Sequence, residues 1–286
     1  MQSPRKTVTA QYSKSVETAR QYYNSEDADN FYFHIWGGED IHIGLYENDQ
    51  EPIATASRRT VQRMARLLGN LDSDTKVIDL GAGYGGSARY LASEYGCQVL
   101  ALNLSETENS RNREMVEAHD LTGLVEVIDG SYEDIPMRDA SFDVAWSQDA
   151  ILHSGDRRQV VSEVARLLKP GGKFVFTDPM QADDCLPENL QPVLDRIHLD
   201  TLGSYTYYRD IAADVGFEEL ECIDLTSDLV THYSRVQQEL MRRRKSLLGR
   251  VSDEYIERML LGLDHWIEAG QKGWLSWGIL LFQKSA

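Results

Sequence analysis

The chain has 286 residues and a formal net charge of −17, from 29 Lys plus Arg against 46 Asp plus Glu. This length fits one α/β domain with added cap segments, and the acidic balance argues against nucleic acid as a partner. No apolar run reaches membrane-spanning length, and no signal peptide is indicated. The basic run at residues 242–245 lies in a helical stretch and is expected to form a solvated face.

The three cysteines are odd in number and far apart in the chain: Cys97, Cys185 and Cys222. Their positions fit neither a disulfide framework nor the spacing of metal ligands. We therefore expect a cytoplasmic protein without a bound metal.

The first segments of the chain predict an amphipathic helix over residues 10–23 and then an irregular segment over 29–46. That segment contains five aromatic residues, two histidines and three glycines. Two interpretations stay open: a hydrophobic plug over a sheet, or a lid whose aromatic faces contact a cationic ligand. Tyr32 and Trp36 are the candidates for such contact. A second amphipathic helix is expected over 53–70.

Residues 76–86 predict a buried strand that runs into a ligand-binding loop. Glycine at every second position, at Gly81, Gly83 and Gly85, lets the backbone turn sharply and approach a ligand closely. Asp79 stands two residues before the first glycine. A predicted helix over 87–95 would direct its free backbone amides at the bound group.

The spacing of this loop differs from the G-x-G-x-x-G fingerprint of dinucleotide-binding proteins. An acid followed by G-x-G-x-G resembles the first motif of the class I S-adenosylmethionine-dependent methyltransferases. In that family the loop cradles the methionine part of the cofactor. A glycine-rich turn without a ligand is the alternative.

The predicted second strand, residues 98–104, ends at Asn103 and Leu104, which the resemblance places at the cofactor. Most members of the class have an acid at the position of Asn103, where it binds both ribose hydroxyls. An amide can still form a hydrogen bond with a hydroxyl, but without the strength of a charged acceptor.

A helix over 106–118 and a third strand over 125–128 follow. Five residues before Pro136, where the wider family often has an aspartate beside the adenine, this chain has Ser131. We therefore expect adenine recognition by backbone groups near Ser131 and Tyr132. Simple packing is the alternative for the Tyr132 ring.

The predicted fourth strand, residues 142–146, is followed by Gln148, Asp149 and His153. Functional groups in doubly wound sheets collect at the carboxyl ends of the strands. Gln148 is assigned to the cofactor site. If the segment is helical, Asp149 and His153 share a face and can orient an amine or accept its proton. A structural hydrogen bond is the alternative for His153.

The remaining pattern predicts a helix over 156–168, a fifth strand over 173–178, a helix over 208–215, a strand over 218–225, helices over 236–249 and 253–269, and a final strand over 273–282. This alternation predicts a doubly wound, mostly parallel seven-stranded Rossmann-like sheet. In this fold class the last strand is usually antiparallel. We expect a lid segment over 1–70 and a core over 71–286, with a cap insertion at about 183–207.

Four segments, residues 36–44, 102–105, 147–154 and 265–268, resemble the sarcosine/dimethylglycine N-methyltransferases that make glycine betaine. The similarity extends from about residue 10 to the C-terminus. It implies methyl transfer from S-adenosylmethionine to sarcosine and N,N-dimethylglycine, with S-adenosylhomocysteine as the second product. The expected partner is thus a small-molecule amine.

Such a reaction needs groups for both ends of the acceptor. Tyr32, Trp36 and Tyr207 are the candidates for contact with the methylated nitrogen. The carboxylate needs a fork of donors, for which Arg196 is the first candidate and Arg209 the second.

Three rival functions stay open. A related methyltransferase would act on phosphoethanolamine or another small amine, and a silent module would bind S-adenosylmethionine without turnover. A nicotinamide oxidoreductase is disfavoured by the glycine spacing.

Overall fold

The computed structural model describes residues 12, 14–48, 50–197 and 199–285. Its centre is a seven-stranded sheet in the order β3-β2-β1-β4-β5-β9-β7, in which β9 runs antiparallel to the six other strands. The strands are β1 (Lys76–Leu80), β2 (Gln98–Asn103), β3 (Val125–Asp129), β4 (Phe142–Gln148), β5 (Leu168–Thr177), β7 (Phe217–Asp224) and β9 (Gly278–Lys284). The predicted fold class, including the antiparallel last strand, is confirmed.

Helices cover both faces of this sheet. One face carries α3 (Ile53–Leu68), α4 (Gly86–Tyr95) and α5 (Glu106–Ala118), and the other carries α6 (Arg157–Leu167) and α8 (Tyr205–Asp214). The apolar residues of α3 recur at helical spacing and are buried against the sheet at Val61, Met64, Ala65 and Leu68. Helix α3 therefore packs with the sheet, although the predicted boundary at residue 70 assigned it to the lid.

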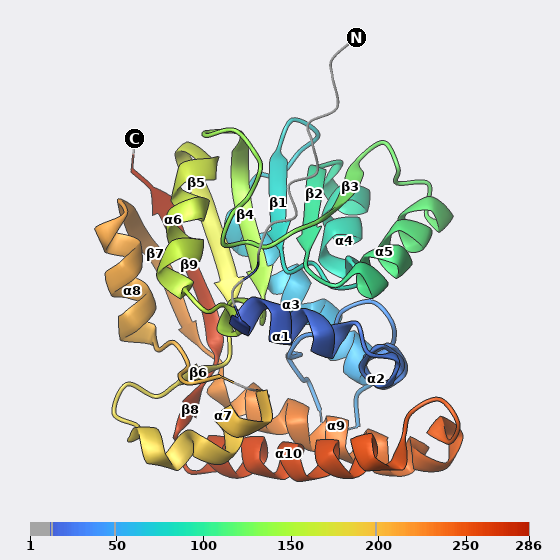
Figure 1. The fold of residues 1–286 in the computed structure, drawn as a ribbon. Helices are drawn as coiled ribbons and strands as arrows, with labels where there is room; N and C mark the ends of the chain where they lie inside the picture. The colour runs from blue at the N-terminus through green and yellow to red at the C-terminus, as the bar shows by residue number, and fades with distance from the viewer. Residues whose placement is uncertain (1–11, 13, 49, 198, 286) are drawn as a thin grey trace.

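A helical cap lies beyond the carboxyl ends of the parallel strands (Figure 1). It contains α1 (Lys14–Tyr23), α2 (Glu26–Trp36), η2 (Pro187–Leu190), α7 (Gln191–Ile197), α9 (Thr226–Leu247) and α10 (Asp253–Gln271). Apolar residues of α2, α9 and α10 form one buried cluster, and those of α7 and α10 contribute to a second. The cap therefore combines segments from the beginning, the middle and the end of the chain.

Helix α9 begins ten residues earlier than the predicted start at 236. Its buried stripe runs through Leu229, His232, Val236 and Leu240. A histidine stands in this stripe, so the apolar periodicity looks broken in the sequence. Helix α8 likewise begins before 208, because Ser204 caps it by accepting a hydrogen bond from the backbone N–H of Tyr207.

The predicted final strand is divided in two. Its first part, β8 (Leu275–Ser276), pairs with β6 (Met180–Gln181) in a separate two-stranded sheet, and β9 pairs with β5 and β7. Between them lies the fully buried Trp277. Helix α1 covers the second part of the predicted helix 10–23, of which residues 10, 11 and 13 lie outside the described residues. No described helix has both the length and the apolarity to cross a membrane.

Substitution of Leu240 tests the packing of the cap. This side chain is fully buried beside residues of α2 and α10, and we expect Leu240→Ala to lower the free energy of unfolding by about 2–5 kcal/mol. Its neighbour Met241 is 59% exposed, so Met241→Ala should change stability by less than about 0.5 kcal/mol. Denaturant unfolding measures both values. Equal effects of the two substitutions would contradict the packing of α9 described above.

Candidate active site

The loop between β1 and α4 needs glycine at its alternate positions. Gly81, Gly83 and Gly85 all have positive φ angles, of 76°, 52° and 74°. A Cβ atom on Gly81 would lie 2.4 Å from the Cβ of Ala150, and one on Gly85 would lie 2.1 Å from the side-chain oxygen of Asn112. The predicted loop thus has the tight turn and the close approach that its spacing indicates.

Asp79 lies at the end of β1 and is 1% exposed. Burial raises the pKa of its carboxyl to about 7, and one of its oxygens has no partner among the described residues. The side chain lines neither of the two cavities described next. One carboxylate oxygen remains free to accept a hydrogen bond, and the contact of Asp79 with a cofactor stays a prediction.

A first cavity, called here the loop cavity, opens beside this turn. Six predicted cofactor residues line it: Gly81, Gly83, Asn103, Leu104, Tyr132 and Gln148. The Tyr132 hydroxyl donates a hydrogen bond to the carbonyl of Ala150 at 2.9 Å, which fixes the ring at the cavity. Ser131 and Gly85 do not line this cavity; the Ser131 hydroxyl accepts a hydrogen bond from the backbone N–H of Glu133.

Glu108 also lines the loop cavity and was missed in the sequence. The Asn103 amide donates to its carboxylate at 2.9 Å, and burial raises the pKa of Glu108 to about 7. The acid that Asn103 lacks is thus supplied by its hydrogen-bond partner from the first turn of α5. Ser105 caps that helix three residues before Glu108, so the sequence pattern matches an ordinary capping box and conceals a second role.

Gln148 presents a free donor in the loop cavity. Its side-chain oxygen accepts a hydrogen bond from the indole N–H of Trp146 at 3.0 Å, which orients the amide. The amide nitrogen has no partner among the described residues. A ligand with an acceptor group at this place would satisfy it, as buried polar groups require.

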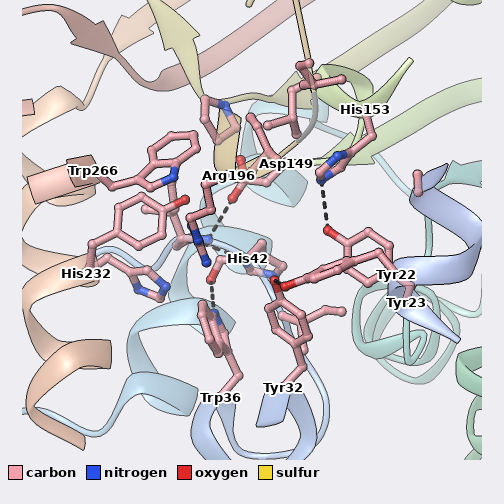
Figure 2. A pocket seen from close by; sticks show the side chains of 18 of the residues that line it. Tyr22, Tyr23, Tyr32, Trp36, His42, Asp149, His153, Arg196, His232 and Trp266 are labelled. Carbon is pink, nitrogen blue, oxygen red and sulfur yellow. Dashed lines mark hydrogen bonds between the residues drawn. The ribbon is translucent and has the colours of Figure 1, made fainter. Parts of the chain in front are cut away.

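A second cavity, called here the aromatic cavity, adjoins the first. Figure 2 shows how rings surround it. They include the predicted Tyr32 and Trp36 and four rings that were not predicted: Tyr22, Tyr23, Tyr233 and Trp266. These four come from α1, α9 and α10, and the sequence holds no local signal that brings three such distant helices together.

Arg196 reaches the aromatic cavity from α7. Its guanidinium contacts the sulfur of Met259 at 3.3 Å, and no described carboxylate lies within 4.0 Å of it. Among the lining residues it is the one Arg or Lys. The cavity therefore has a single fixed cation whose charge is free to meet an anionic ligand group.

Tyr207 and Arg209 lie outside both cavities. Because α8 begins at Tyr205, it turns Tyr207 to the surface, where 37% of the residue is exposed. Arg209 forms an ion pair with Glu219 of β7, and its side chain is 46% exposed. The structure thus brings Tyr32, Trp36 and Arg196 to one cavity and places Tyr207 and Arg209 at neither.

Asp149 and His153 stand where the two cavities meet, because both residues line both cavities. They do not form the expected helical pair: Asp149 has a φ angle of 50°, and only Ile151–His153 form a short 3₁₀ turn. The Asp149 carboxylate accepts hydrogen bonds from the backbone N–H of Ile43 at 2.7 Å and from the indole N–H of Trp277 at 2.8 Å.

His153 forms a hydrogen bond with Tyr23 at 2.8 Å, between its Nε2 atom and the tyrosine hydroxyl (Figure 2). Burial, together with the charges of Arg157 and Arg196, lowers the pKa of His153 to about 4. The imidazole is therefore neutral near pH 7, with one nitrogen that donates and one that accepts.

Comparison with known proteins agrees with this architecture. A family model described as a methyltransferase domain matches residues 78–176. A sarcosine/dimethylglycine N-methyltransferase of Halorhodospira halochloris is 59% identical over 95% of this chain and 97% of its own length. A crystal structure of a candidate sarcosine dimethylglycine methyltransferase from Galdieria sulphuraria has a TM-score of 0.88 and 45% identity, covering 92% of this chain and 99% of that one.

A longer relative contains a region similar to this chain. The glycine/sarcosine/dimethylglycine N-methyltransferase of Actinopolyspora halophila is 55% identical over 94% of this chain, which spans only 47% of that protein. Identity of this level over nearly the whole chain establishes the family. The chain belongs to the sarcosine/dimethylglycine N-methyltransferases.

Proposed function

We propose that the loop cavity binds S-adenosylmethionine, that the aromatic cavity binds the amine, and that methyl transfer takes place where they meet. The chain is an N-methyltransferase that converts sarcosine and N,N-dimethylglycine to glycine betaine, as its family does. The observation that carries the proposal is the shared wall of the two cavities, which includes Tyr23, Tyr32, Asp149 and His153. Holding two reactants in line across such a wall can supply most of the rate enhancement.

The loop cavity fits the proposed cofactor. When bound, S-adenosylmethionine supplies an electrophilic methyl group on a sulfonium. Gly81 and Gly83 leave space for close approach of its methionine part, and the free Gln148 amide offers a donor to the carboxylate there. Asn103 and Glu108 together offer donors and acceptors for the ribose hydroxyls, while Tyr132 borders the cavity at the expected adenine side.

The aromatic cavity fits an acceptor with a cationic nitrogen and one carboxylate. The ring faces of Tyr32 and Trp36 stabilise the charge that becomes permanent when the nitrogen is quaternary. Arg196 supplies a planar fork for the carboxylate. A phosphoethanolamine acceptor would bring about one more negative charge, and among the described lining residues no second Lys or Arg meets it.

The place where the two cavities meet, called here the junction, contains the candidate proton acceptor. An amine attacks only as its free base, so a group near it must take a proton. His153 is the candidate for this role, because its imidazole is neutral and its hydrogen bond with the Tyr23 hydroxyl fixes the orientation of the ring. Asp149 is a positioning residue, because both of its oxygens are already held by Ile43 and Trp277.

The three free cysteines support a reducing compartment for the protein.

A panel of labelled methyl-transfer assays tests the function, with glycine, sarcosine, dimethylglycine and phosphoethanolamine as acceptors. We expect turnover of sarcosine and dimethylglycine and none of phosphoethanolamine. Arg196→Lys should raise the KM for dimethylglycine about tenfold or more, because an ammonium cannot form the bidentate contact, with the cofactor Kd unchanged. Arg209→Lys is the matched control and should behave as wild type. Binding of cofactor without turnover of any acceptor would support the silent-module alternative.

The raised pKa of Glu108 leads us to expect a cofactor affinity that depends on pH. Its pKa of about 7 leaves the carboxyl partly protonated in the empty site, while the ionised form accepts hydrogen bonds from ribose hydroxyls better. The affinity for S-adenosylmethionine should therefore rise from about pH 6 to about pH 8. In Glu108→Gln the affinity should be lower and nearly constant with pH. Calorimetric titrations at several pH values measure this, with the exposed Glu117→Gln as control; parallel profiles would contradict the role.

His153→Ala should lower kcat about 100-fold or more, because it removes the proton acceptor. The loss should be the same at every pH above about 6, since an imidazole with a pKa of about 4 is already neutral there. Tyr23→Phe should have a smaller effect, because the imidazole remains. Steady-state rates against pH check this, and His119→Ala, at the exposed end of α5, is the control. An unchanged kcat would return His153 to a structural role.

A further inference from the structure

Three tyrosine hydroxyls form a continuous contact beside the aromatic cavity. The Tyr22 hydroxyl lies 2.9 Å from that of Tyr255 and 3.3 Å from that of Tyr32. Tyr22 and Tyr32 line the cavity, whereas Tyr255 is 2% exposed and does not line it. The consecutive helices α1 and α2 and the distant α10 contribute one hydroxyl each, so the sequence has no local signal that places Tyr255 beside the other two.

Arg196 lies at the same place. Its guanidinium contacts Met259 Sδ at 3.3 Å, and the Tyr22 hydroxyl lies 3.8 Å from the same sulfur. Because both groups contact one atom, the hydroxyl row and the free cation of the cavity are neighbours. Figure 2 shows Arg196 near the middle of the lining rings, with Tyr22, Tyr32 and the pair His153–Tyr23 to its right.

Burial decides which way the hydroxyl protons point. Each hydroxyl has one proton to donate, and burial raises the pKa values of Tyr32 and Tyr255 well above the ordinary range, so both stay protonated. Tyr255 has no described acceptor for its hydroxyl proton other than Tyr22. A buried donor without a partner is costly, so Tyr255 donates to Tyr22.

The proton of Tyr22 then has two possible acceptors. The sulfur of Met259 is a weak acceptor at 3.8 Å, and the oxygen of Tyr32 at 3.3 Å is the better of the two. If Tyr22 donates to Tyr32, the proton of Tyr32 is the last of the row and must point away from Tyr22. Tyr32 borders the cavity, so an acceptor atom of a ligand can receive it there.

We propose that the hydroxyls of Tyr255, Tyr22 and Tyr32 form a one-way row of donors whose last proton binds the acceptor's carboxylate beside Arg196. This inference rests on the proposed function and identifies what makes the site selective for amino acids. Each donor in such a row polarises the next, so Tyr32 becomes a stronger donor than an isolated hydroxyl. The role belongs to the Tyr32 oxygen and is separate from the contact of its ring face with the nitrogen.

The row also explains discrimination against an amino alcohol of the same shape. Both carboxylate oxygens meet the Arg196 fork, and one of them also accepts the Tyr32 proton with a charge-assisted hydrogen bond. A neutral CH2OH group satisfies these two groups less well, which leaves Arg196 and Tyr32 poorly partnered. Sites built around such donors reject ligands that lack the matching group.

The test uses Phe substitutions, which keep each ring and remove one oxygen. In Tyr32→Phe the KM for dimethylglycine should rise about tenfold or more, with kcat within about twofold of wild type and the S-adenosylmethionine Kd unchanged. Tyr22→Phe should raise the KM less, and Tyr255→Phe least, because they act through Tyr32. The ratio of the kcat/KM values for dimethylglycine and N,N-dimethylethanolamine measures the preference for a carboxylate. This ratio should decrease most in Tyr32→Phe, less in Tyr22→Phe and least in Tyr255→Phe.

A double variant separates the row from independent effects. If Tyr22 acts through Tyr32, then Tyr22→Phe/Tyr32→Phe should have the same KM as Tyr32→Phe alone. Tyr95→Phe is the control, since Tyr95 ends α4 and lines neither cavity. An unchanged KM in Tyr32→Phe, an equal change for the amino alcohol, or additive effects in the double variant would overturn the proposal. A wild-type enzyme inactive on dimethylglycine would instead refute the proposed function.

Discussion

Both cavities depend on the hydrogen bonds that the Asp149 carboxylate accepts. One oxygen accepts the backbone N–H of Ile43, in the segment that follows α2, and the other accepts the indole N–H of Trp277, between β8 and β9. The residue itself follows β4 in a left-handed conformation, and its own N–H donates to Thr177 of β5. One side chain therefore fastens the start of the cap and the end of the chain to the carboxyl edge of the sheet, where the two cavities meet.

These hydrogen bonds give Asp149 a structural role and leave His153 as the candidate proton acceptor. Burial raises the pKa of Asp149, while the nearby His42 and the two hydrogen bonds lower it, so its bonded carboxylate serves to hold the architecture. His153 has no carboxylate among the described residues within ion-pair distance, and burial keeps it neutral. In the proposed reaction a neutral group beside the amine is favourable, because an ion pair with the amine would trap its protonated form.

The glycine loop was predictable because its determinants are local: strand, turn and helix follow one another within about twenty residues, as such motifs do. The aromatic cavity was predictable only in part. Tyr32 and Trp36 stood out by their density in one segment, but Tyr22, Tyr233 and Trp266 join them through packing between distant helices. Where a local rule was satisfied, it also concealed a second role, because Glu108 completes a capping pattern. Elsewhere the local pattern misled: His232 interrupts the apolar stripe of α9, and the start of α8 places Arg209 at the surface.

Successive methylation in one cavity follows from the same division. Sarcosine and dimethylglycine both present a nitrogen that must lose one proton before it attacks, so one proton acceptor at the junction serves each cycle. The product of the last cycle has neither a proton nor a lone pair on nitrogen, so it cannot react again and cannot form a hydrogen bond with His153. Its affinity then depends on the ring faces and on the carboxylate contacts alone. In the proposed site, the loss of the amine hydrogen bond favours release of the finished product over that of the partly methylated intermediate.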